Sequence, residues 1–195
     1  MMVEDRELSA LAPRIWERWT QAVDRKGDPF RTVALATSSP EHGASARMVV
    51  LRAVEPSERW LEFHTDARSG KIADLSDDPR ATLLFWDPAA QLQLRAEGRV
   101  ALYGADTREA AERFAKLGSG ARRTYRTEQP AGAPLERPEA LRFTLSSGDD
   151  PASTSFVVAR LTVERIDWLQ LSDEGQRRAE IVYREGSATQ RWIAP

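Results

Sequence analysis

The chain has 195 residues, of which 41% are hydrophobic and 30% charged, so it can bury a core and is not a disordered protein. Its formal net charge of −2 argues against a general binder of nucleic acids or membrane surfaces, which would usually show a basic excess. Because the sequence has no cysteine and only two histidines, we exclude thiol catalysis, disulfides and cysteine-based or histidine-rich metal sites.

Helical spacing marks the first predicted element, at about residues 9–26, with Ser9 as a candidate cap and Gly27 as a candidate end. We expect its apolar face to pack in the core, and that face holds Leu11, Ile15, Trp16, Trp19 and Val23. The opening MMVEDRELSA has no apolar signal core, and no apolar run approaches the length of a membrane span. These features predict a soluble, cytoplasmic protein.

Three strands are predicted next, at residues 31–37, 46–54 and 60–65, with turns at SSPEHG and EPSER. His42 falls in the first turn, where we expect it to be solvated. Strand alternation in the second strand puts its two arginines on opposite faces: Arg47, Val49 and Leu51 on one, and Met48, Val50 and Arg52 on the other.

A short helix is predicted at about 70–75, with Ser69 as its cap and Lys71 in its first turn. Lysine is unfavourable there because the helix dipole prefers acidic groups at that end. An anion bound at the helix start would explain it. The segment from 47 to 71 also gathers further cations and hydroxyls, which favours a phosphate site: Arg47, Arg52, His64, Thr65, Arg68 and Ser69.

Strands are then predicted at 81–86, 91–103 and 156–171, with a closing hairpin of 180–184 and 189–193. The strand at 91–103 alternates clearly between a polar face with Gln93 and an apolar face, and Gly98 indicates a bulge or a close backbone approach.

Between the strands we expect a helix at 106–117, capped by Asp106 with Glu109, and a Gly/Pro-rich stretch at 118–138 that is mostly loop with a short helix near Arg122. Residues 141–145 are a candidate short strand. Together the elements predict a single mainly β domain, 1–195, built as a small antiparallel barrel with flanking α-helices.

An ordered set of motifs runs through this pattern. It comprises Arg-x-Val-x-Leu-Arg at 47–52, Phe-His-Thr-Asp at 63–66, Arg-Ser-Gly-Lys at 68–71, Asp-Pro-Arg-Ala at 78–81, Phe-Trp at 85–86, and Gln-Leu-Gln-Leu-Arg at 91–95 before Gly98. With these motifs the chain resembles the pyridoxamine 5′-phosphate oxidase family from about Trp16 to Pro195. The resemblance implies an FMN-binding split β-barrel of Greek-key topology and a homodimer that binds FMN at its interface.

By this resemblance, Arg47 and Lys71 would grip the FMN phosphate, with hydrogen bonds from Ser69, Thr65 and the helix N-terminus. The backbone of 48–51 would run along the isoalloxazine, and Gln93 would reach the ring from the partner strand. The full set of cofactor-binding residues that the resemblance implies is Arg47, Met48, Val49, Val50, Leu51, Arg52, His64, Thr65, Arg68, Ser69, Lys71 and Gln93.

The substrate half of the family pattern is less well kept. Arg52 stands where the oxidases have a lysine for the substrate phosphate, and residues 176–179 lack the Arg-x-His motif. On the following helix the family has a tyrosine, an arginine and a serine, which are not repeated at Phe114, Gly118 and Arg122. The family's tryptophan that helps hold the flavin has no clear counterpart here, although Trp168 lies close to its position in the sequence. The arginines that could hold an anionic substrate are Arg52, Arg122, Arg177 and Arg178.

We therefore expect an FMN-dependent oxidoreductase that oxidises or reduces a small substrate, phosphorylated or not, through a flavin that does the electron chemistry. One alternative is a protein that binds a flavin or a related cofactor, such as a deazaflavin or haem, or a reductase, without pyridoxamine phosphate oxidase activity. The other is a barrel without a cofactor, whose cations are merely solvated. The sequence does not name the substrate or the electron acceptor.

Overall fold

The computed structural model describes residues 2–41, 43–144, 152–173, 175–185 and 187–195. His42 and residues 145–151 therefore lie outside the described residues.

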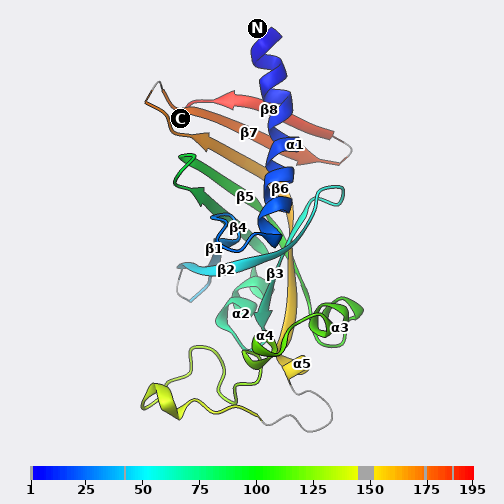
Figure 1. The fold of residues 1–195 in the computed structure, drawn as a ribbon, viewed down its shortest axis with the longest axis vertical. Coiled ribbons are helices and arrows are strands. Elements are labelled where there is room, and N and C mark those ends of the chain that lie inside the picture. Colours follow the sequence, from blue (N-terminus) through cyan, green and yellow to red (C-terminus); the bar gives the residue numbers. More distant parts are fainter. Residues whose placement is uncertain (1, 42, 145–151, 174, 186) are drawn as a thin grey trace.

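Six antiparallel strands form a closed barrel. Figure 1 shows how the strands lie relative to the helices. They lie in the order β3-β2-β1-β4-β5-β6, and a pairing between β3 and β6 closes the ring. The order β4-β1-β2-β3 is that of a Greek key. The barrel strands are β1 Thr32–Ser39, β2 Gly43–Glu55, β3 Trp60–Asp66, β4 Arg80–Asp87, β5 Leu92–Tyr103 and β6 Phe156–Gln170, and the sheet continues beyond β6 with β7 Arg177–Arg184 and β8 Ser187–Ile193.

Strand β6 joins the barrel to this extension. Its first half pairs with β3, its second half pairs with β7, and β5 lies along its other edge throughout. The register between β5 and β6 shifts at Gly98, where a Cβ atom would lie 1.9 Å from the carbonyl oxygen of Thr162. The predicted bulge and close approach at Gly98 are thus confirmed, because no larger residue fits without moving β6.

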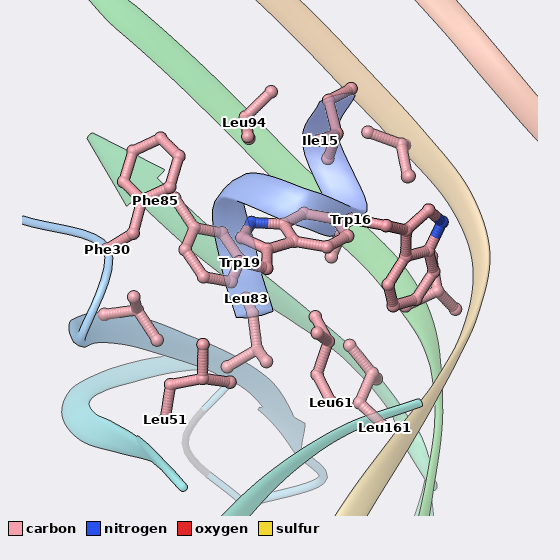
Figure 2. Packing of buried hydrophobic residues seen from close by; sticks show 14 of the residues in the cluster. Ile15, Trp16, Trp19, Phe30, Leu51, Leu61, Leu83, Phe85, Leu94 and Leu161 are labelled. Atoms are coloured by element: carbon pink, nitrogen blue, oxygen red, sulfur yellow. The ribbon is translucent and has the colours of Figure 1, made fainter. Parts of the chain in front are cut away.

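The helices are α1 Met2–Asp24, α2 Gly70–Asp77, α3 Arg108–Ala115, α4 Ser119–Arg123 and α5 Ala152–Ser155, with a 3₁₀ turn at Pro138–Ala140. Helix α1 runs across the barrel and inserts Trp19 into its core (Figure 2). The Trp19 ring is fully buried, with its centroid 5.1 Å from that of Phe85. The predicted core packing of Trp16 and Trp19 is confirmed.

Three local predictions were wrong. Helix α1 begins well before Ser9, whose hydroxyl donates to the carbonyl of Arg6 instead of capping the helix. Thr107, and not Asp106, caps α3, since its hydroxyl accepts from the Ala110 N–H at 3.2 Å. Among the described residues 141–144 there is no strand, and Phe143 makes an isolated bridge to Thr127. At α3 two adjacent polar residues, Asp106 and Thr107, could each cap the helix, and the structure uses the second.

Candidate phosphate site and the outer face of the sheet

Arg47 lies at one end of the barrel, on the β2 face that carries the buried Val49 and Leu51, as the alternation predicts. Its guanidinium donates to the Thr37 hydroxyl at 2.5 Å and to the Ser45 hydroxyl at 2.8 Å. It also pairs with the Asp74 carboxylate of α2 at 3.2 Å. These contacts to β1, β2 and α2 fix the planar group beside the start of α2.

Lys71 reaches the same place from α2. Its ammonium donates to the hydroxyls of Thr65 and Ser69, each at 3.0 Å, and forms no ion pair with a carboxylate in the described part of the chain. Burial lowers the pKa of Lys71, and the positive charge of Arg47 lowers it further, while Asp66 and Asp74 act in the opposite direction. An ammonium desolvated beside a second cation is a group that an anion would stabilise.

The start of α2 adds its own attraction for an anion. The helix begins at Gly70, with Ser69 in the N-cap position and no acidic side chain in the first turn. The Ser69 hydroxyl makes no capping bond and donates instead to the carbonyl of Asp66 at 2.8 Å. First-turn N–H groups, two hydroxyls, an ammonium and a guanidinium are the donor set that a phosphate group requires, so these residues fit the phosphate of FMN.

Two of the predicted site residues, Arg68 and His64, bind other residues of the chain. Arg68 forms two hydrogen bonds to Asp66, at 2.9 and 2.7 Å, and one to the carbonyl of Thr127 at 2.6 Å, which ties down the loop after α4. His64 lies on the face of β3 opposite Thr65. Its imidazole is 6% exposed, with Nε2 3.2 Å from the Glu62 carboxylate.

The surroundings of His64 form a second buried cluster, beneath α3. The imidazole meets the ring of Phe156 edge-on at 4.8 Å between centroids, and its Nδ1 has no partner in the described part of the chain. Glu62 is fully buried and pairs with Arg113 at 2.8 Å and Arg160 at 2.9 Å. Burial would raise the pKa of Glu62, but the His64 and Arg160 hydrogen bonds and the Arg113 charge lower it overall.

The outer face of β2, β1 and β4 carries exposed apolar side chains. Met48 is 62% exposed, Trp86 39% and Leu84 37%. Met48 and Leu84 lie opposite Ala34 from either side, and Trp86 lies opposite Gln93 of β5. This arrangement, here called the apolar patch, places Gln93 beside a surface of the kind that usually marks a binding interface.

A network of charges continues across the outer face of β5, β6 and β7. Asp167 is fully buried and accepts from Arg95 at 2.6 Å and from Arg178 at 2.7 and 3.0 Å. Burial would raise the pKa of Asp167, but these two arginines hold it below its usual value. Arg165 joins Glu97 and Glu180 to the network, at 2.8 and 2.7 Å. The sequence analysis missed this network, although the paired charges two residues apart on neighbouring strands were a signal for it.

Of the four arginines considered for an anionic substrate, three are bound within the chain. Arg122 donates to the carbonyls of Leu117 and Ala115, at 2.9 and 2.8 Å, Arg177 pairs with Glu7 at 2.7 Å, and Arg178 pairs with Asp167. Arg52 alone of the four has no ion pair or hydrogen bond to the residues that the structure describes. It lines a pocket of about 290 Å³ together with the charged residues Lys26, Arg31 and Asp24.

The sequence matches one protein family and a group of named enzymes over part of its length. The model of the pyridoxamine 5′-phosphate oxidase FMN-binding domain matches residues 13–104. The pyridoxine/pyridoxamine 5′-phosphate oxidase of Paraburkholderia xenovorans is 31% identical over 141 residues, which cover 71% of this chain and 65% of that protein. The enzyme of the same name from Trichormus variabilis is 36% identical over 88 residues, covering 45% and 40%. The chain therefore matches less than two thirds of the length of these relatives.

Two solved structures share the fold along almost the whole chain. A pyridoxamine 5′-phosphate oxidase-related, FMN-binding protein of Nostoc punctiforme has a TM-score of 0.75 at 22% identity and covers 94% of this chain and 96% of its own. PhzG of Burkholderia lata, solved with tetrahydrophenazine-1-carboxylic acid, has a TM-score of 0.73 at 19% identity, covering 93% and 91%.

Fold and family match together define a split β-barrel flavoprotein. Residues 13–104 match the FMN-binding domain of the pyridoxamine 5′-phosphate oxidase family, whose cofactor is FMN. The predictions of fold and family are confirmed. In the described residues, no helix is long and apolar enough to cross a membrane.

Proposed function

We propose that this protein is an FMN-dependent oxidoreductase of a small molecule, with the FMN phosphate held between Arg47 and Lys71. The observation that carries the proposal is the convergence of these two cations at the start of α2, where Lys71 bonds to hydroxyls and to no described carboxylate. Bound FMN supplies the capacity to accept and return electrons. The chain binds the cofactor, orients it and excludes water from it.

The proposed orientation follows from the strand that carries Arg47. Beyond Arg47, the backbone of 48–51 leads away from the phosphate site along β2 and would lie beside the isoalloxazine. The Gln93 amide on the outer sheet face offers a donor and an acceptor to the polar edge of a flavin ring. The contacts of His64 place it in the cluster under α3, so its side chain reaches a flavin only if that cluster opens.

We further propose that a second copy of the chain covers the apolar patch. Met48, Leu84 and Trp86 form an exposed apolar surface on an open sheet face, and a twofold axis would let the same surface of the second copy cover it. The homodimer would then enclose the flavin ring between two sheets.

A second candidate function is a flavoprotein that acts on a substrate other than pyridoxamine or pyridoxine phosphate. The partners of Arg122, Arg177 and Arg178 support it, because they leave Arg52 as the free cation among the four candidates in the described part of the chain. With the other three engaged, these four candidates do not supply the several donors that a phosphate dianion requires. PhzG, which has the same fold, was solved with a carboxylic acid.

Reconstitution with FMN tests the proposal. The purified protein is mixed with excess FMN and passed through a gel-filtration column while absorbance is followed at visible and ultraviolet wavelengths. We expect a flavin band that elutes with the protein at one FMN per chain and at the size of a dimer. A protein that loses all flavin on the column would contradict the function. Turnover with pyridoxine phosphate then separates the two candidate activities.

A further inference from the structure

An open hollow with a volume of about 710 Å³ lies on the surface between α1, the turn from β2 to β3, and β7. Figure 1 shows this turn projecting beside α1. We call it the α1 cavity, and none of its lining residues belongs to the proposed FMN site. The residues that matter for its chemistry are Pro13, Trp16, Glu17, Pro56, Arg59 and Tyr183.

The walls of the α1 cavity are largely carbon surface. Trp16 donates its ring N–H to the hydroxyl of Tyr183 at 2.8 Å, and the two ring centroids are 6.4 Å apart. This bond satisfies the Trp16 N–H, so the part of the wall that the two rings form is mainly carbon surface. Pro13 and Pro56 add two rigid rings from opposite sides. This is a lining suited to a flat aromatic group.

Arg59 supplies the charge. Its backbone has φ of 59°, in the left-handed region that favours glycine, and its carbonyl accepts from the Val163 N–H at 2.8 Å. Its guanidinium lies over the ring of Tyr183, 5.2 Å from the centroid, without an ion pair among the described residues. A strained position occupied by arginine is a reason to look for a function of that side chain.

We propose that the α1 cavity binds a small flat aromatic molecule with one negative charge, an aromatic monocarboxylate, and that Arg59 binds its carboxylate. Arg59 and Glu17 are the charged residues among the described lining, and Glu17 accepts from the Gln21 amide at 3.2 Å. The Arg59 guanidinium can pair with one carboxylate, and the negative charge of Glu17 in the same lining disfavours the second charge of a phosphate ester. The proposal concerns a second site and does not depend on the proposed flavin chemistry.

The test uses isothermal titration of the protein, after incubation with FMN, with 1-naphthoate as the probe. Two variants address the cavity. Arg59→Gly removes the charge and relieves the left-handed backbone, so a loss of binding cannot be ascribed to misfolding. Thr20→Phe fills the cavity from an exposed position on α1. Arg80→Ala is the matched control, since Arg80 is an exposed arginine paired with Asp78 away from the cavity.

We expect one 1-naphthoate per chain, a loss of affinity of about tenfold or more in Arg59→Gly, loss of binding in Thr20→Phe, and no change in Arg80→Ala. We also expect 1-naphthyl phosphate to bind more weakly than 1-naphthoate. Failure of 1-naphthoate to bind, equal binding in wild type and both cavity variants, or a preference for the phosphate would each overturn the proposal. Uptake of FMN, measured in the same samples, reports on the proposed function separately.

Discussion

Replacing Lys71 with methionine tests whether this lysine serves to bind a ligand or to stabilise the fold. In the free protein the Lys71 ammonium has two hydroxyl partners, is half-buried, and faces the charge of Arg47. Methionine keeps the aliphatic length, and the hydroxyls of Thr65 and Ser69, 3.3 Å apart, can still bond to each other. We therefore expect Lys71→Met to change the free energy of unfolding of the free protein by less than about 1 kcal/mol.

The same variant should lose a charge-assisted contact to the FMN phosphate. Such a contact contributes roughly 1.5–3 kcal/mol, so the dissociation constant for FMN should rise by about 10-fold to 150-fold. Arg47→Met should weaken FMN similarly but also destabilise the free protein, because it breaks the contacts to Thr37 and Asp74. Flavin fluorescence titration and urea unfolding measure the two effects. Unchanged FMN affinity in Lys71→Met would refute the reasoning.

Further predictions concern the fold and the dimer. Glu62→Gln should cost about 3 kcal/mol at pH 7, a fall in Tm of roughly 6–12 °C, because it removes the buried charge that pairs with two partly buried arginines, Arg113 and Arg160. The fold lowers the pKa of Glu62, so its contribution to the free energy of unfolding is fully present above about pH 4.3, the pKa in the unfolded chain. That contribution is lost as the pH falls through the lower pKa of the folded state. Thermal scans in which Glu62→Gln is still destabilised to the same extent at pH 2 would contradict this. Gly98→Ala should destabilise by about 2–3 kcal/mol in urea unfolding, while Gly120→Ala, where a Cβ meets no atom within 4 Å, should not. If a second copy covers the apolar patch, Met48→Glu should give a monomer in light scattering, and Leu135→Glu, at a residue 39% exposed in a loop, should leave the proposed dimer intact.

The barrel strands could be predicted because their local signals agree. Val49 and Leu51 alternate with outward residues along β2, and β5 alternates in the same way, so their buried faces follow from a period of two. A glycine within a strand, Gly98, also predicted the bulge between β5 and β6. Closure of the barrel could not be predicted in this way, because the pairing of β3 with β6 joins residues about a hundred positions apart, and periodicity says nothing about distant partners.

The candidate site was predictable only in part. The order of Arg47, Ser69 and Lys71 along the sequence indicated a phosphate site, and the structure brings their side chains together. For His64 and Arg178, residue type suggested a ligand contact, but the fold supplies protein partners, Glu62 and Asp167. Tertiary contacts decide which charged side chains form ion pairs within the chain. A sequence pattern shows which residues are charged but not which of them will pair.

The most direct test of the account compares the affinities of the free protein for FMN and for riboflavin, which differ only in the phosphate. If Arg47 and Lys71 hold that phosphate, FMN should bind at least about 100-fold more tightly than riboflavin, and the preference should fall to a few-fold when both residues are methionine. Equal affinity for FMN and riboflavin in the wild-type protein would contradict the account, because the cations at the start of α2 would then have no part in binding the cofactor.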